Sequence, residues 1–156
     1  MDNWDIYRFV NAKKSESSLT SLVERTVTDL YNNTAKSVGN FAFYNCITLE
    51  TVKFTEAESI GNYAFRGSTS LITAVFPKVT AIANNAFNMC AALTALVLGG
   101  TQVASLNGSS ALTDTAIASG TGYIYVPDSL VNDYKAAVNW KTYASQIRPL
   151  SAYEEV

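Results

Sequence analysis

The chain has 156 residues, a formal net charge of -2, 15% charged residues and no histidine. This length corresponds to about one domain with its own core. The low and balanced charge offers no basic surface for nucleic acid or an anionic membrane. The lack of histidine removes the Ser-His-Asp and Cys-His arrangements and every histidine-containing metal site. We therefore expect a protein that is not an enzyme and that holds no metal or cofactor.

The chain opens without the basic and apolar stretches of a secretory leader, and no run approaches the roughly 20 apolar residues of a membrane span. We therefore expect cytoplasmic synthesis and no membrane insertion. Residues 1–25 combine a cluster of apolar side chains with a polar stretch, which predicts a short amphipathic helix and a linker. This segment has two interpretations: an N-terminal helical cap, or an attachment or oligomerisation arm that presents Trp4, Tyr7 and Phe9.

Three consecutive segments, which start at Ser37, Ser59 and Ala81, align without gaps at a period of 22 residues. Residues 26–30 add half a repeat before them. Apolar residues recur at the same phase in each unit, and the end of each unit alternates apolar and polar residues as a β-strand does. The shared apolar columns are Val38, Ile60 and Ile82; Phe43, Phe65 and Phe87; Leu49, Leu71 and Leu93; and Phe54, Phe76 and Leu98.

A unit of this size cannot bury its own apolar side, whereas stacked units share one continuous core. The sequence therefore predicts an α/β solenoid over residues 26–122. Over residues 37–98 the columns resemble the units of BspA-like bacterial leucine-rich repeats, which read approximately I-G-x-x-A-F-x-x-C-x-x-L-x-x-I-x-[IF]-P. The resemblance implies a short leucine-rich-repeat stack of about four coils, of the kind found in gut Firmicutes and their prophages. It also implies a role in adhesion or protein recognition.

Beyond the third unit, residues 107–122 are rich in Gly, Ser, Thr and Ala, which predicts a degenerate last coil. The β-rich run YIYVP follows, and Asp128 or Ser129 is placed to cap a helix whose apolar side includes Val138. We expect residues 123–156 to form a C-terminal strand-plus-helix cap, since a solenoid needs a closing unit. The ending also resembles the tail of many repeat proteins of this class, which accompany virion and tail genes.

The outward row of the strand side is the candidate binding surface. Its polar character gives way to apolar residues toward the third unit, and an exposed apolar strip rimmed by polar residues is typical of protein contact surfaces. The alternative is that the C-terminal cap folds back over this row and buries it. The candidate binding residues are Thr51, Lys53, Thr73, Val75, Ala95 and Val97.

A hydrolase, or an accessory domain of one, is the rival from a different class. It would use carboxylates such as Glu56, Asp114 or Asp128, and it needs two of them about 5 to 10 Å apart across a cleft. Glu56 lies on an expected loop, which favours a solvated turn over catalysis.

Cys46 and Cys90 occupy one repeat column two units apart. Coils stacked at the usual strand spacing would separate their backbones by about 10 Å, which is beyond disulfide reach. We therefore interpret both as buried thiols.

The sequence thus favours a non-enzymatic protein-binding or adhesion module. Its resemblances imply a phage or prophage tail or surface protein, located on a virion or a bacterial cell surface. The alternative is a secreted or cell-surface bacterial adhesin of the BspA-like type. The expected partner is a protein or a bacterial envelope surface. In a third, architectural hypothesis, residues 1–25 drive homo-oligomerisation and the solenoid acts as a spacer.

Overall fold

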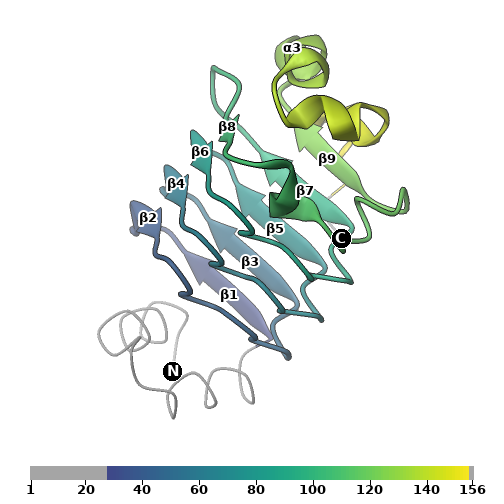
Figure 1. Ribbon diagram of the computed structural model, residues 1–156. Helices are drawn as coiled ribbons and strands as arrows, with labels where there is room; N and C mark the ends of the chain where they lie inside the picture. Colours follow the sequence, from purple (N-terminus) through teal and green to yellow (C-terminus); the bar gives the residue numbers. More distant parts are fainter. Residues whose placement is uncertain (1–27, 155–156) are drawn as a thin grey trace.

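The computed structural model describes residues 28–154, which form a stack of coils with two parallel sheets (Figure 1). The long sheet has six strands, and the short sheet has four. In order across the long sheet, the strands are β1 (Asp29–Asn32), β3 (Thr51–Phe54), β5 (Thr73–Phe76), β7 (Ala95–Leu98), β9 (Tyr123–Val126) and β10 (Ile147–Pro149). The short sheet contains β2 (Ser37–Val38), β4 (Ser59–Ile60), β6 (Ala81–Ile82) and β8 (Ser105–Leu106).

Each coil runs along a strand of the long sheet, turns into a strand of the short sheet, and returns through a second turn (Figure 1). This arrangement confirms the predicted short leucine-rich-repeat solenoid. The register equals the sequence period, because Thr51 pairs with Thr73 and Ser37 pairs with Ser59. The turns take part in the same pairing, since the Phe43 amide donates to the Ala64 carbonyl oxygen one coil further on. In the first three coils, residues one period apart therefore lie side by side in both sheets.

Aromatic rings fill the space between the two sheets. The ring of Phe65 stacks on Phe43 and Phe87, with centroids 5.3 Å and 5.2 Å apart, and Phe54 stacks on Phe76 at 5.5 Å. All five side chains are buried. Burying one such ring stabilises the fold by roughly 1.5–3 kcal/mol relative to its exposure. The repeated phenylalanine columns thus contribute to the cohesion between coils.

The second turn of each of the first three coils contains two residues with a left-handed backbone, and that of the fourth coil contains one. This conformation is uncommon outside glycine, asparagine and aspartate because the side chain approaches the backbone. It recurs at the same two places in successive coils. The left-handed residues are Phe41, Tyr63 and Asn85 at the first place, and Asn45, Gly67, Met89 and Asp114 at the second.

The chain after β9 packs on the last coil beside β8. The Asn139 side-chain amide donates to the Leu106 carbonyl oxygen at 2.7 Å, and the Tyr143 hydroxyl donates to the Ser109 carbonyl oxygen at 2.7 Å. These contacts give hydrogen-bond donors to carbonyl oxygens of the last coil, which has no further coil beside it to supply them. The helical elements are η1 (Ser109–Leu112), η2 (Asp128–Leu130), α3 (Val131–Ala136), η3 (Trp140–Gln146) and η4 (Leu150–Ala152).

Two details of this region differ from the sequence-based expectation. The helix is shorter than predicted, because α3 ends at Ala136 and the chain continues as a separate turn of 3₁₀-helix. Val138 lies in the break, and its side chain is 76% exposed and not part of an apolar face. Asp128 does not cap α3; its carboxylate instead accepts a hydrogen bond from the Ser151 amide at 3.0 Å.

The long sheet also continues past residue 122, beyond which we expect the C-terminal cap. Strand β9 pairs with β7 and β10 pairs with β9, both in parallel. Among residues 28–154, no helix is long and apolar enough to cross a membrane. The proposed N-terminal cap or arm, residues 1–25, lies outside the described residues.

Candidate functional site

The outward face of the long sheet carries two rows of side chains. Because neighbouring strands are in register, residues that share a repeat position lie side by side. Strands β3 and β5 alternate half-exposed and buried residues, so each contributes two residues to the face. The first row contains Tyr31, Lys53, Val75, Val97 and Tyr125, and the second contains Asp29, Thr51, Thr73, Ala95 and Tyr123.

A groove of about 530 Å³ lies on this face. It extends from β1 to β9, which at the usual strand spacing is a span of about 19 Å. The groove is lined by Tyr31, Thr51, Lys53, Ile72, Thr73, Val75, Thr94, Ala95, Thr121, Tyr123, Tyr125, Tyr153 and Glu154.

Tyrosines lie at both ends of the groove, and most of the side chains between them are threonine, valine or alanine. Tyr31 belongs to the first strand, whereas Tyr123 and Tyr125 belong to the fifth. Tyr31 is 46% exposed and Tyr123 is 40% exposed. Tyrosine buries a large, rigid ring at low cost in conformational entropy and keeps a hydroxyl for hydrogen bonding. The groove thus offers anchoring side chains at its ends and an uncrowded floor between them.

Contacts with the C-terminal segment order the aromatic end of the groove. The Arg148 guanidinium lies over the Tyr123 ring, 4.8 Å from its centroid, and the rings of Tyr125 and Tyr153 are 5.0 Å apart. The Arg148 side chain also donates to the carbonyl oxygens of Ser145 and Ile147. These tyrosines are therefore held before any partner arrives.

Of the six residues expected on the binding face, five line the groove: Thr51, Lys53, Thr73, Val75 and Ala95. Val97 does not, because it is only 6% exposed. It lies beside Tyr125 in the first row, where Tyr153 reaches the face. Contact surface and burial by the C-terminal cap are the two interpretations of the outward row, and they apply to different parts of it. The C-terminal segment reaches one end of the row, and most of the row remains accessible. The expected attachment residues Trp4, Tyr7 and Phe9 lie outside the described residues.

Several groove residues were not identified from the sequence. Tyr31 precedes Lys53 by one 22-residue period, so extending the repeat columns backward would have found it. Tyr123 and Tyr125 follow a stretch in which the period is lost, but their alternation with Ile124 and Val126 marks them as outward. No sequence signal indicates that Tyr153 returns to this face.

The family comparison agrees with this architecture. The family described as BspA type leucine-rich repeat region (6 copies) matches residues 19–125, which is more than half of the chain. The chain belongs to the BspA-type leucine-rich-repeat family. None of the curated proteins matches it.

One similar solved structure is a leucine-rich repeat protein of T. pallidum, with 23% sequence identity and a TM-score of 0.46. The match covers 64% of this chain. This BspA-type chain spans 58% of the length of that protein.

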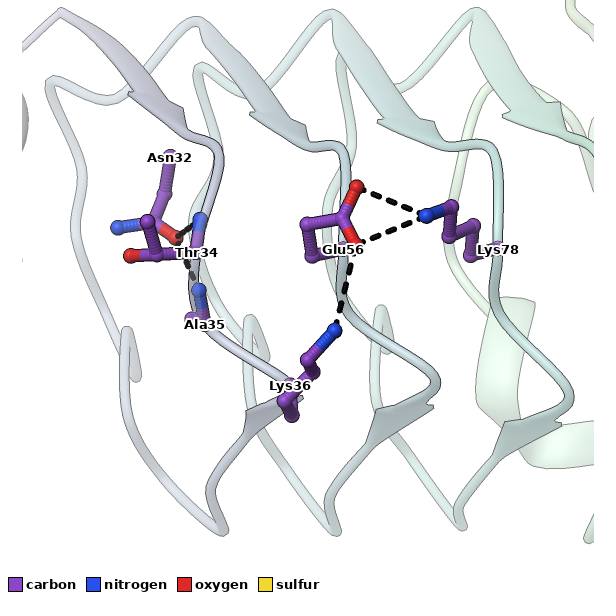
Figure 2. Close-up of polar contacts among 6 residues, drawn as sticks. All are labelled: Asn32, Thr34, Ala35, Lys36, Glu56 and Lys78. Atoms are coloured by element: carbon purple, nitrogen blue, oxygen red, sulfur yellow. Dashed lines mark hydrogen bonds and ion pairs between the residues drawn. The ribbon is translucent and has the colours of Figure 1, made fainter.

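The carboxylates considered for hydrolysis lie outside the groove of this BspA-type stack. Glu56 is bound between lysines of neighbouring coils, with its carboxylate 2.8 Å from the Lys78 ammonium and 3.3 Å from that of Lys36 (Figure 2). Hydrogen bonds from Lys78 and then Lys36 lower the pKa of Glu56 below its ordinary value. Hydrogen bonds from Ser151 likewise lower the pKa of Asp128. A general acid needs a raised pKa, so neither carboxyl suits that role.

The cysteine column is structural. Cys46 and Cys90 are buried and unbridged. The Cys90 thiol donates to the Phe65 carbonyl oxygen at 3.0 Å, and in the intervening coil the Ser68 hydroxyl donates to the Phe43 carbonyl oxygen at 2.8 Å. Burial raises the pKa of Cys90 to about 12, which keeps the thiol protonated and unreactive. Within residues 28–154, no group of three or more His, Cys, Asp or Glu is arranged to hold a metal ion.

Proposed function

We propose that this BspA-type chain is a non-enzymatic adhesion module that binds a protein partner through the groove of its long sheet. The observation that carries the proposal is a groove with tyrosines at both ends and mainly threonine, valine and alanine between them. Aromatic residues are enriched in protein interfaces, and leucine-rich repeats serve generally as interaction scaffolds. Lys53 and Glu154 are the charged residues of the lining, so contact with aromatic and hydroxyl groups outweighs charge attraction.

The rigidity of the stack supports the same role. Strands β3, β5, β7 and β9 under the groove each pair with a neighbour on both sides, and stacked phenylalanine rings pack in the core beneath them. Outward residues of a solenoid vary without disturbing the core, which suits a scaffold that evolves toward new partners. Binding to such a surface loses little conformational entropy because the loops do not need to be ordered.

The proposed location is the surface of a bacterium or of a virion. BspA-type repeats are often associated with surfaces, and the sequence of the C-terminal region resembles tails of repeat proteins that accompany virion genes. We favour a phage or prophage tail or surface protein, with a bacterial cell-surface adhesin as the alternative. Mass spectrometry of particles released from an induced source strain, and of its cell-surface fraction, distinguishes the two locations.

The binding test compares two valine-to-arginine substitutions. Val75→Arg places a long charged side chain in the groove, whereas Val138→Arg alters a residue that is 76% exposed elsewhere. The full chain and both variants are incubated with extracted envelope proteins and with purified virions. We expect Val75→Arg to weaken binding about tenfold or more and Val138→Arg to leave it unchanged. Equal binding by both variants, or no binding by the unaltered chain, contradicts the proposal.

A further inference from the structure

A second cluster of exposed and half-buried side chains lies on the turns that follow the short sheet, and none of its members lines the groove. We name it the turn ridge, and it consists of Phe41, Tyr44, Tyr63, Arg66 and Met89. The Phe41 and Tyr63 rings are stacked, with centroids 4.9 Å apart, and Tyr44 lies 5.5 Å from Phe41. Phe41 is 54% exposed and Met89 is 44% exposed. The ridge is therefore a strip of aromatic side chains that Arg66 connects to Met89.

Three residues of the ridge have a backbone conformation that their side chains disfavour. Phe41, Tyr63 and Met89 have φ values of 59°, 59° and 63°. Asn85 takes the same position as Phe41 and Tyr63 in the next coil, and asparagine adopts this conformation readily. The fold therefore does not need aromatic side chains there. Strained residues that the fold does not require are a recognised mark of functional sites.

The rings also contribute little to the core, because they lie outside the buried phenylalanine columns. Arg66 extends along the ridge in a fixed position. Its Nε donates to the Asn88 side-chain oxygen at 2.9 Å, an Nη lies 3.7 Å from the Met89 sulfur, and the guanidinium lies 5.6 Å from the Tyr63 centroid. Aromatic residues, methionine and arginine are the residues enriched at the centres of protein interfaces. Arg66 is the charged member of this set.

The charges indicate how a partner would lie. Arg66 is in the second full coil, and the exposed Asp114 occupies the Met89 column one coil beyond Met89. A carboxylate on the partner is attracted to Arg66 and repelled by Asp114, so it lies toward the first coil and its apolar neighbours meet Phe41 and Tyr63. Arginine binds carboxylates through a planar fork of donors, which gives this contact direction as well as strength.

We propose that the turn ridge is a second docking site, and that it binds a polypeptide segment with a carboxylate next to apolar side chains. The ridge and the groove are separate surfaces of one rigid stack. The chain would thus hold two partners at once and connect them. The proposal does not depend on the groove being a binding site.

The test selects peptides against a chain whose groove is blocked. A displayed library of random peptides is selected on the immobilised full-length Val75→Arg variant, so that groove binders are disfavoured. Enriched peptides are synthesised and measured against that variant with and without further substitutions in the ridge. Phe41→Asn with Tyr63→Asn places in both coils the residue that Asn85 shows to be compatible with this backbone. Arg66→Gln removes the charge, and a peptide with glutamine in place of its acidic residue is the reciprocal change.

We expect enriched peptides to carry an acidic residue beside apolar ones and to lose about tenfold or more in affinity when both rings are removed. Arg66→Gln should weaken the acidic peptide more than its glutamine version. We expect the melting temperature of the double asparagine variant to change by only a few degrees. Peptides that bind the double variant equally well overturn the proposal. A melting temperature lowered as far as by Phe65→Ala also overturns it, because the rings would then be structural.

Discussion

The indole nitrogen of Trp140 and the hydroxyl of Tyr134 converge on the backbone of one residue, Ala104. Trp140 donates to the Ala104 carbonyl oxygen at 2.7 Å, and the Ala104 amide donates to the Tyr134 hydroxyl at 2.9 Å. Both aromatic side chains are buried and contact each other edge to face, with centroids 5.3 Å apart. Beside β8, the side chains of Trp140 and Tyr134 thus form the hydrogen bonds to the Ala104 backbone that an additional coil would otherwise form.

Removal of the Tyr134 hydroxyl should destabilise the protein. Tyr134→Phe keeps the ring but leaves the buried Ala104 amide without its acceptor, at a cost of about 1–3 kcal/mol. Urea unfolding followed by circular dichroism measures this difference. Tyr44→Phe is the matched control, since Tyr44 is partly exposed on the turn ridge, and we expect a change below about 0.5 kcal/mol. Equal effects of the two substitutions would show that the Ala104 contact does not contribute.

Truncation of the central phenylalanine column should be more damaging. The Phe65 ring is fully buried between Phe43 and Phe87, so Phe65→Ala leaves a cavity that the rigid coils cannot close. We expect a loss of about 3–5 kcal/mol in the free energy of unfolding. Phe41→Ala removes the same ring from the surface and should cost much less. Comparable unfolding midpoints for the two variants would refute the central role of the column.

The buried thiol should make stability depend on alkaline pH. Burial raises the pKa of Cys90 from 9.0 to about 12, so the unfolded chain releases a proton above pH 9 that the folded chain retains. The contribution of this thiol to stability is complete below pH 9 and declines as the pH rises toward 12. Unfolding midpoints measured across this range, with Cys90→Ser as the control, should fall more steeply for the chain that retains the thiol.

The same burial should protect Cys90 from modification. The Cys46→Ser variant leaves one thiol, and Ser68 shows that a hydroxyl is accommodated in this column. We expect a thiol reagent to label Cys90 slowly in the native protein, at the rate at which the fold opens locally or unfolds globally. In denaturant we expect rapid labelling. Rapid labelling under native conditions would contradict the buried position.

Deletion of one whole coil should leave a folded protein. Removing residues 59–80 deletes one full period and joins Glu58 to Ala81. The apolar columns stay in phase, because Ser37 pairs with Ser59 and Ser59 pairs with Ala81, each one period further along the chain. We expect an unchanged shape of the circular dichroism spectrum and a lower melting temperature, since a repeat protein loses stability with each coil removed. Deletion of residues 59–69 is the control. It shifts the columns out of phase and should abolish cooperative unfolding.

The sequence predicted the parts of the fold in which the repeat is regular. Phe43, Phe65 and Phe87 recur at a fixed spacing, and only stacked coils bury all three. After Leu98 the spacing between strands changes, so the sequence contains no register that would place Tyr123 beside Ala95. The pairing is set by how the last coil and the C-terminal segment pack together, which periodicity does not encode.

Two features of the surface were beyond sequence reasoning for a different reason. An alternation pattern marks Val97 as outward, but the residue is only 6% exposed. It pairs with Tyr125, whose ring lies 5.0 Å from that of Tyr153, a tail residue distant in the chain. Similarly, nothing in the residue types of Phe41 and Tyr63 indicates a left-handed backbone, because aromatic residues rarely adopt one. Hydrogen bonds between turns impose that conformation, as in the bond from the Phe41 amide to the Asn62 carbonyl oxygen.

The equality of the pairing register and the sequence period has a consequence for the gene. Recombination between two repeat copies that misalign by one unit adds or removes a whole number of codons and preserves every apolar column. The reading frame and the core therefore survive the event together. Such an event changes the number of coils, and the length of the groove changes with it.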